Sequence, residues 1–344
     1  MRRADLEHLI LLGSLSVLTT CGGSEAAPSP GFVPPNPGGP LPDGSGITVL
    51  AISSLDFGDE TVEAWKAIGL DIDGKETTAT STDVCSYAPG AFPPLLADGD
   101  NGIDNSFGEN LVPLLYDLLT TTLSQDANAA LRAGDATTLF AINRLGSQAN
   151  YAPLDAVGYR AAPSEAPRWD GSDKRDVDVA SLISGDISQP ILTLSGGYMN
   201  GRVWVSGPAS GDALFDIHLA REGHFPDPFP IHHVRVLLKI DPTNRVATSG
   251  ILAGIVSPDD AIRWMRQMAG WDSNIHCSQS ALDGFEEQIR QAADIFIDGS
   301  NHAGAPCDGI SFGIGFDAML VTLGDAVSVP PTAPPDDCPD AGDE

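Results

Sequence analysis

The fold class of this chain is decided by the stretch Leu194-Ser195-Gly196-Gly197-Tyr198-Met199-Asn200-Gly201-Arg202-Val203-Trp204-Val205-Ser206. Two runs rich in β-forming residues lie on either side of Asn200-Gly201. This dipeptide is strongly favoured in two-residue hairpin turns, because such turns need positive φ angles that Asn and Gly tolerate. The sequence therefore predicts a hairpin of two antiparallel strands at this point.

Further short extended runs surround the hairpin, and Gly-Gly, Ser-Gly-Asp and Asp-Pro turn signals separate them. Ile310–Asp317 alternates strictly and is expected to complete a sheet begun in the N-terminal third, where Ile47–Ser54 is the first expected strand. Many short strands with Gly-rich turns indicate an antiparallel β-sandwich or barrel-like domain. The other expected strands are Leu139–Leu145, Ala213–Leu219, His232–Ile240 and Val246–Ile255.

Three regions have the 3.6-residue period of amphipathic helices, near 111–133, 258–269 and 279–297. The second is the clearest, because Ser257 can cap its N-terminus and Pro258 suits its first turn. We expect these helices to flank the sheet. The predicted fold class is therefore α+β, mainly β.

The charge of the chain narrows the classes of function. Of its 344 residues, 18 are Lys or Arg and 47 are Asp or Glu, which gives a formal net charge of −29. Such a chain repels the phosphates of nucleic acids and the headgroups of anionic lipids. We therefore expect no nucleic-acid partner and no membrane binding through a basic patch. The same charge attracts divalent cations.

The first residues have the pattern of an export signal with a lipid-attachment site. Residues 1–21 combine Arg2 and Arg3 with an apolar run of signal length, and Leu18 stands three residues before Cys21, as in the lipobox of bacterial lipoproteins. The alternative is a plain secretory signal with an incidental cysteine. We expect a lipoprotein signal peptide, a lipid anchor at Cys21, and a location at the outer membrane or the cell surface.

The composition divides the remaining chain into three parts. Residues 22–46 are rich in Pro, Gly and Ser, cannot bury a core, and predict a disordered tether. Residues 47–328 are expected to form a single β-rich domain. Residues 329–344 are expected to form an acidic disordered tail.

Four cysteines remain after Cys21, and an even number in an exported chain predicts two disulfides. Four cysteines allow three pairings. We favour Cys277–Cys307, which would join the two ends of one helix, and this choice leaves Cys85–Cys338 as the second pair.

The densest group of acidic and amide side chains in the predicted domain lies at residues 98–110. Asp98, Asp100, Asp104 and Glu109 stand at positions 1, 3, 7 and 12 of a possible calcium loop, and Ca²⁺ prefers such hard oxygen ligands. The glycine that an EF-hand requires is missing, so any site would be of a looser type.

A second interpretation of this stretch is purely structural. Asp104, Asn105 and Ser106 are turn and cap residues that can start the following helix. We carry both interpretations, with Ca²⁺ as the expected cofactor of the first. Asp71 and Asp73 are further candidate ligands.

The sequence contains no Gly-x-Ser-x-Gly elbow, no P-loop and no HExxH motif. His218, His224, His232 and His233 lie close together, but their spacing matches no known metal motif. We expect a surface-anchored lipoprotein with a binding or structural role and a carbohydrate or protein ligand. The alternative is an exported carbohydrate-active or other hydrolase that uses a carboxylate pair, whose separation the sequence does not reveal.

Three blocks of sequence carry a resemblance to a family. They are Ile68–Gly74, Asp98–Gly108, and Ala292–Ile295 together with Pro306–Phe316. In these blocks the chain resembles uncharacterised secreted lipoproteins of myxobacterial type. The resemblance implies a surface or outer-membrane location and no assigned activity.

Overall fold

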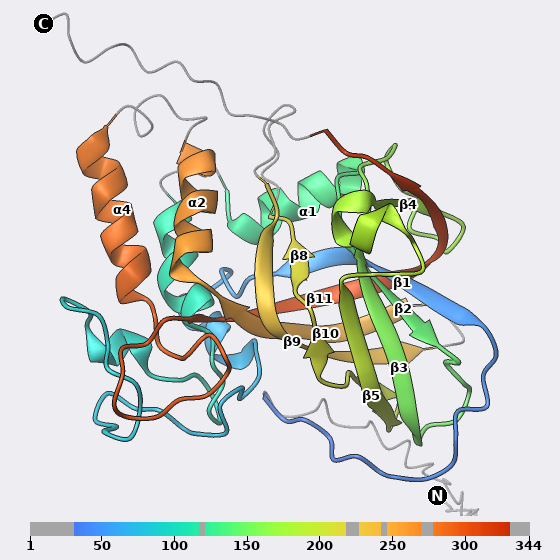
Figure 1. The fold of residues 1–344 in the computed structure, drawn as a ribbon, viewed down its shortest axis with the longest axis horizontal. Coiled ribbons are helices and arrows are strands. Elements are labelled where there is room, and N and C mark those ends of the chain that lie inside the picture. The colour runs from blue at the N-terminus through green and yellow to red at the C-terminus, as the bar shows by residue number, and fades with distance from the viewer. Residues whose placement is uncertain (1–30, 117–120, 218–226, 242–245, 270–277, 331–344) are drawn as a thin grey trace, which may run out of the picture.

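The computed structural model describes residues 31–116, 121–217, 227–241, 246–269 and 278–330 (Figure 1). Its centre is a closed antiparallel β-barrel of eight strands, in which each strand pairs with the next and the last pairs with the first. The predicted mainly β fold with flanking helices is confirmed, in its barrel form. The strands in order around the barrel are β1 (Ile47–Asp56), β2 (Thr138–Asn143), β3 (Tyr151–Arg160), β5 (Leu192–Asn200), β6 (Val203–Val205), β9 (Phe229–Asp241), β10 (Val246–Val256) and β11 (Ile310–Val327).

Three short strands pair with strands of this barrel without belonging to its closed ring. β4 (Lys174–Asp178) runs parallel to the end of β11, β7 (Ala209–Ser210) pairs with β5, and β8 (Ala213–Phe215) pairs with β9. The expectation that the C-terminal strand completes a sheet begun in the N-terminal third is confirmed, since β11 pairs with β1 and Val49 lies opposite Val321.

The predicted hairpin is present as β5 and β6, but its turn lies one residue later than expected. Asn200 pairs with Val203, so Gly201 and Arg202 are the two central residues, with φ angles of 58° and 68°. The Asn200 side chain instead donates a hydrogen bond of 2.7 Å to the carbonyl of Pro35.

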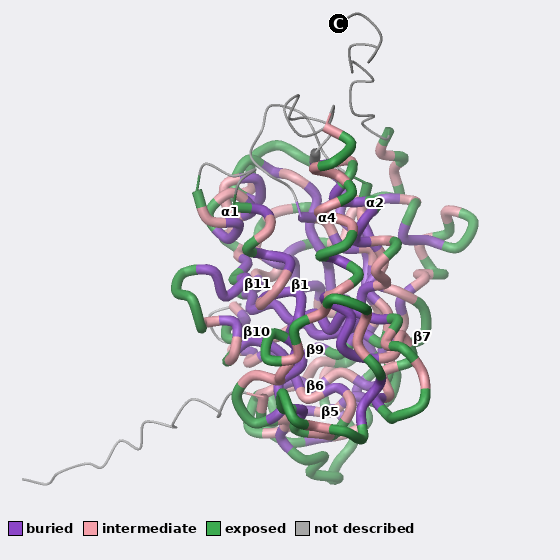
Figure 2. The backbone as a smooth tube through the Cα atoms, turned by 90° about the vertical axis from the view of Figure 1, so that its left-hand side faces the viewer, coloured by how far each residue is buried: buried purple, intermediate pink, exposed green. Residues whose placement is uncertain are grey.

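The barrel interior is filled with side chains. Trp204, Phe140 and Phe316 form an aromatic group there, with Trp204 and Phe140 in edge contact at 5.8 Å between ring centroids. A second group, around Phe312 and Phe229, lies where the barrel meets α2. Figure 2 shows this continuous buried zone along the strands. Truncating such a buried aromatic side chain typically costs about 3–5 kcal/mol, so these groups fix the closed form.

Helices flank one end of the barrel (Figure 1). α1 (Leu123–Ala133) begins at Thr122, whose side chain accepts a hydrogen bond from the Gln125 amide, and ends at Gly134 in the left-handed conformation. α2 (Pro258–Ala269) has the predicted bounds. α4 (Gln279–Gln291) is shorter than expected, because the chain after it turns to pair Ile295 with Gly309.

Of the two helical pieces expected near 111–133, the second, Asp126–Ala133, is confirmed as α1, but the described part of the first, Leu111–Leu123, is not an α-helix. Phe107–Leu111 form a π-helical turn and Pro113–Leu115 a 3₁₀ turn, before α1 begins separately. Pro113 lacks the amide hydrogen that a continuous helix would need at this position. The stretch is therefore a compact connection rather than a helix.

Residues 31–46 belong to the folded domain, contrary to the expected tether. The Tyr198 hydroxyl donates to the carbonyl of Pro34 at 2.5 Å, and the Arg144 guanidinium donates to that of Pro42 at 2.7 Å. Gly31 also forms a parallel bridge with Leu70. The expected signal peptide, the lipid anchor at Cys21, the first part of the tether and most of the acidic tail lie outside the described residues.

Among the described helices, none combines the length and the apolar character needed to cross a membrane.

Candidate metal centre

The acidic stretch at residues 98–104 forms a loop that is fastened to the segment 65–75. The Gly99 amide donates to the Ile103 carbonyl at 2.8 Å, which closes the loop. The Asp100 amide donates to Lys66 O at 2.8 Å, and the Asp104 amide donates to Leu70 O at 3.1 Å. These backbone bonds place the Asp104 side chain beside the following turn.

Three carboxylates meet at this turn. Asp71, Asp73 and Asp104 each contribute an oxygen, and these oxygens all lie within 4.8 Å of one another. Asp104 Oδ2 accepts hydrogen bonds from the amides of Ile72 at 2.6 Å and Asp73 at 3.4 Å. Asp104 is only 2% exposed, so its carboxylate is fixed from the protein side.

Two further carboxylates belong to the same acidic neighbourhood. Asp98 Oδ2 accepts a hydrogen bond from the Thr77 amide at 2.5 Å. Asp294, which is 7% exposed, accepts from both the amide and the hydroxyl of Ser311, at 2.8 and 2.6 Å. The acidic cluster, as used below, means Asp71, Asp73, Asp98, Asp104 and Asp294.

The pKa values of the cluster show the cost of burying these charges together. Burial raises the pKa of Asp98 to about 8, and repulsion by Asp294 and Asp73 adds to the shift. Burial also raises the pKa of Asp294 to about 7, although its hydrogen bonds from Ser311 oppose this. The pKa of Asp104 lies well above its ordinary value, first because of burial and then because of the charge of Asp73.

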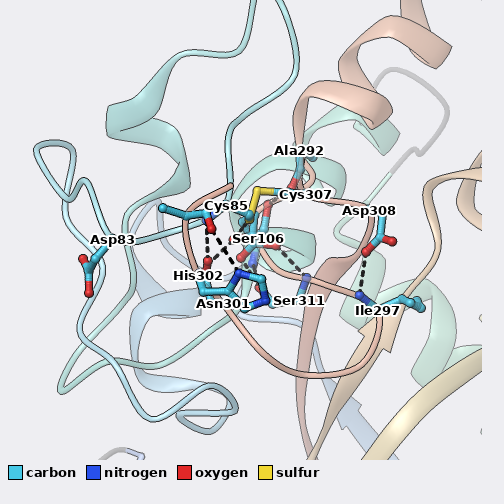
Figure 3. Close-up of a disulfide and its surroundings, with 12 residues drawn as sticks. Asp83, Cys85, Ser106, Ala292, Ile297, Asn301, His302, Cys307, Asp308 and Ser311 are labelled. Atoms are coloured by element: carbon cyan, nitrogen blue, oxygen red, sulfur yellow. Dashed lines mark hydrogen bonds between the residues drawn. A yellow bond between two sulfur atoms is a disulfide. The ribbon is translucent and has the colours of Figure 1, made fainter. Parts of the chain in front are cut away.

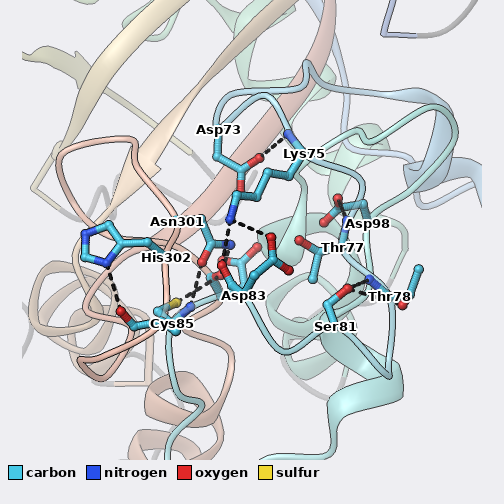
Figure 4. A network of polar contacts seen from close by, with 12 residues as sticks. Asp73, Lys75, Thr77, Thr78, Ser81, Asp83, Cys85, Asp98, Asn301 and His302 are labelled. Carbon is cyan, nitrogen blue, oxygen red and sulfur yellow. Dashed lines mark hydrogen bonds and ion pairs between the residues drawn. The ribbon is translucent and has the colours of Figure 1, made fainter.

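No basic side chain neutralises the negative charge of the acidic cluster among the described residues. Within the described residues, none of its five carboxylates forms an ion pair. The nearby Lys75 ammonium contacts Asp83 instead, at 3.0 Å from the carboxylate and 2.6 Å from the carbonyl (Figure 4). The charge of Arg235 lowers the pKa of Asp71, but burial outweighs this effect and the pKa remains above its ordinary value.

Several oxygens at the cluster have no hydrogen-bond partner although they are buried. They are Asp73 Oδ2, Thr77 Oγ1 and Tyr87 Oη. Thr77 is 4% exposed, and its own amide donates to Asp98. The charges of Asp294 and Asp98 help to raise the pKa of Tyr87, after burial, which places this phenol beside the cluster. Buried oxygens without partners are rare in folded proteins, and a bound cation is one explanation for such a group beside carboxylates.

The donor set fits a hard cation. All candidate ligand atoms are oxygens, as Ca²⁺ requires, and Ca²⁺ binds six to eight of them. No histidine or cysteine belongs to the group, which disfavours zinc. Asp71, Asp73 and Asp104 would be direct ligands, with Asp98 and the unpartnered oxygens beside them.

The sequence prediction identified part of this centre. Asp104 lies in the three-carboxylate group together with Asp71 and Asp73, the two residues expected to be additional ligands. Asp98 lies next to this group, but Asp100 is exposed and contributes only its amide. Glu109 is half-buried near Lys66, and burial raises its pKa to about 8. Predicting Asp100 and Glu109 as ligands by EF-hand spacing is therefore not supported, because the loop closes differently.

The interpretation as helix-start residues holds for Asn105, whose side chain accepts from the Gly108 amide at 3.0 Å, but not for Ser106, whose side chain makes no cap bond. The Asn105 side chain accepts from the Gly313 amide at 3.0 Å and donates to the Ile68 carbonyl at 2.8 Å. The Ser106 amide donates to Ser311 Oγ, which in turn donates to Asp294. The stretch therefore joins the loops to β11 as well as supplying acids.

A disulfide lies next to the cluster, with Cys85 Sγ 3.4 Å from the Asp294 carbonyl oxygen; Figure 3 shows its surroundings. Cys85 pairs with Cys307, so the predicted pairings Cys277–Cys307 and Cys85–Cys338 are both wrong. The bond joins segments separated by 222 residues. The Asn301 side chain reinforces it by accepting from the Cys85 amide at 2.7 Å. Cys277 and Cys338 lie outside the described residues.

The histidines do not form a second centre within the described residues. His232 Nδ1 contacts Asp212 at 2.8 Å, while His233 is exposed with a φ of 51°. Asp216 is held by Arg160 at 2.7 and 2.8 Å, in a buried ion pair. His218 and His224 lie outside the described residues.

Comparisons of the chain with protein-family models, with curated proteins and with solved structures found no match.

The raised pKa values predict an unusual pH dependence for the calcium-free protein. A carboxyl group whose pKa is raised by folding stabilises the fold while it is protonated. That contribution is complete below the unfolded value of about 4 and is lost as the pH rises through about 7 and 8. In EDTA, we expect the free energy of unfolding, and with it the melting temperature, to fall between about pH 4 and pH 8, by about 1–3 kcal/mol per pH unit.

Thermal melts of Asp98→Asn and Asp100→Asn test the origin of this slope. Asp98→Asn should flatten it, because the amide carries no charge at any pH, whereas exposed Asp100→Asn should leave it unchanged. A melting temperature in EDTA that stays constant or rises over this range would contradict the assignment.

Proposed function

We propose that this protein is an exported lipoprotein that a lipid at Cys21 anchors to the outer membrane or cell surface. Its barrel has a binding or structural role, with a ligand outside the cell, and bound Ca²⁺ holds the loops at residues 71–77 and 98–104 in place. The observation that carries the calcium proposal is the acidic cluster without counter-charge, together with the unpartnered oxygens of Asp73 and Thr77.

A structural ion fits these residues better than a catalytic one. Asp104 and Asp294 are 2% and 7% exposed, so a substrate has no access to them. A glycoside hydrolase needs its two carboxylates on either side of the bond that it cleaves, where the substrate can reach them. The cluster instead lies between loops that Asn105 and the Cys85–Cys307 bond hold together. A cation at the cluster would stabilise the contacts between these loops and take no part in a reaction.

Two observations support export. The pattern of residues 1–21 is that of a lipoprotein signal. The Cys85–Cys307 bond is of the kind that persists in oxidising compartments. In such a compartment, millimolar calcium would saturate even a weak site at the cluster.

Calcium titration tests the proposal most simply. We expect Ca²⁺ to raise the melting temperature of the EDTA-treated protein by several degrees, since binding at 100 times the dissociation constant adds about 2.7 kcal/mol. Asp73→Asn and Asp104→Asn should abolish this increase. Asp100→Asn, in the same loop but exposed, is the matched control and should retain it. An EDTA-treated protein whose melting temperature ignores Ca²⁺ would refute the calcium site.

The anchor is tested separately by fractionation of cells that express the full chain. Cys21→Ser should move the protein from the detergent-extractable membrane fraction to the soluble exported fraction, because the thiol that carries the lipid is lost. Cys277→Ser serves as a control for cysteine loss and should leave the distribution unchanged. Equal membrane association of Cys21→Ser and the parent chain would argue against lipidation.

A further inference from the structure

A cavity of about 380 Å³ lies against the outer face of the barrel, away from the filled interior. Its floor is formed by outward residues of β6, β9, β10, β11 and β1, and the loop at 67–70 forms one wall. This volume lies at the lower end of the range for small-molecule sites, about 300–1,000 Å³. The cavity is separate from the acidic cluster, although Leu70 in its wall immediately precedes Asp71.

Two adjacent rows of paired residues define this floor. In one row, Leu237, Ile251 and Gly315 lie side by side on β9, β10 and β11. The row ends at Asp56 on β1, which pairs with Gly315. This row is apolar until it reaches the carboxylate, and Gly315 has no side chain to fill the space.

The second row has opposite charges at its two ends. Lys239 on β9 pairs with Val203 of β6, and Asp317 on β11 pairs with Ser54 of β1. β10 lies between β9 and β11, so the α-carbons of Lys239 and Asp317 are about 10 Å apart. Lys239 thus lines one end of the cavity, and Asp317 lines the other with Asp56.

Lys239 is notable because this protein has few cations. The chain has only four lysines, and the other three form ion pairs: Lys66 with Glu63, Lys75 with Asp83, and Lys174 with Asp325. Lys239 forms no ion pair with any described residue. In a chain of net charge −29, an ammonium group left unpaired in a cavity is available to an anionic group of a ligand.

The two carboxylates at the other end are equally available. Asp317 accepts only from the Ser249 amide at 3.1 Å and weakly from Ser54 Oγ at 3.4 Å. Asp56 accepts from the Gly58 amide at 2.9 Å. Neither forms an ion pair within the described part of the chain, so each retains free lone pairs for a cationic donor.

The backbone around the cavity departs from regular strand geometry. The pairing register shifts in β1 between Ile52 and Ser54, and in β10 between Ala247 and Gly250. Ser249, inside the second irregularity, has a φ of 53°. Bulges and strained residues concentrate at binding sites, where they re-aim side chains and amides.

The segment 31–34 covers part of the cavity and is held on both sides. Gly31 bridges to Leu70, and the carbonyl of Pro34 accepts from Tyr198. Phe32, between them, lines the cavity and is 55% exposed. It offers an apolar ring to a ligand in the cavity.

We propose that this cavity binds a short zwitterionic peptide with apolar side chains. The peptide carboxylate contacts Lys239, the ammonium group contacts Asp56 and Asp317, and the side chains cover Ile251 and Leu237. The separation of the charged ends favours a dipeptide-sized ligand over a free amino acid. The inference rests on the proposed binding role but not on calcium, and it names the class of ligand.

Isothermal titration of the calcium-loaded, full mature domain with L-leucyl-L-leucine tests this assignment. Two analogues, N-acetyl-leucyl-leucine and leucyl-leucine amide, each remove one charge. We expect saturable binding of the free dipeptide and at least about tenfold weaker binding of each analogue, as the loss of one charge-assisted contact implies. Lack of saturable binding of the free dipeptide at millimolar concentration would overturn the proposal.

Two variants locate the charges. Lys239→Met should weaken the free dipeptide about tenfold and remove its advantage over the amide, while the advantage over the acetylated form stays. Asp317→Asn should remove the advantage of the free dipeptide over the acetylated form, while its advantage over the amide stays. Lys174→Met, whose ion pair lies on β4 and β11 outside the cavity, is the control and should bind like the parent. Unchanged discrimination in Lys239→Met would overturn the proposed orientation.

A repeat of the titration after EDTA treatment separates this inference from the calcium proposal. Peptide binding that continues without calcium supports the cavity by itself. If peptide binding fails while calcium still raises the melting temperature, the ligand class is wrong and the calcium-stabilised lipoprotein remains.

Discussion

Buried carboxylates that lie close together repel one another unless a proton or a cation balances their charge. This constraint governs the region where the barrel of this protein meets its loops. Asp104 and Asp294 are almost fully buried, and neither has a basic partner among the described residues. A protonated cluster satisfies the constraint at low pH, and the proposed divalent cation would satisfy it at neutral pH. The positions of loops 71–77 and 98–104 depend on which of these applies.

One strand, β11, connects this cluster to the rest of the molecule. Ser311 at its start donates two hydrogen bonds to Asp294. Gly313 allows the loop to approach closely, since a Cβ there would lie 2.7 Å from the Ile68 carbonyl oxygen. Asp317, further along, lines the outer cavity. The inward side chains of β11, including Phe312 and Phe316, belong to the barrel core. The loops and the cavity are therefore both attached to the same rigid strand.

Features with a local signal could be predicted from the sequence. The helix at 258–269 has a cap, a first-turn proline and a clear period, and the strand at 310–317 alternates strictly. β3 was not predicted, because Pro153 and Gly158 interrupt its pattern. The hairpin turn lies one residue later than predicted, with Asn200 in β5 and its side chain bonded to Pro35, far away in the chain.

The candidate site required contacts that no local pattern encodes. The Asp-rich spacing pointed to Asp104 and, less directly, to Asp71 and Asp73. Asp294 joins them from a segment almost two hundred residues later, through Ser311. The disulfide likewise joins positions 222 residues apart, so helix-end geometry suggested the wrong partner for Cys307. Such long-range pairings are set by the closed barrel rather than by neighbours in the sequence.

The most direct test of the account is the number of protons released when calcium binds. Calorimetric titration at pH 7 in buffers of different ionisation enthalpy measures this number. The cation requires deprotonated ligands, and burial holds the pKa values of Asp98 and Asp104 above the ordinary range. The account predicts one bound Ca²⁺ per chain with release of roughly one to two protons. Calcium binding without proton release, or no binding at all, would contradict it.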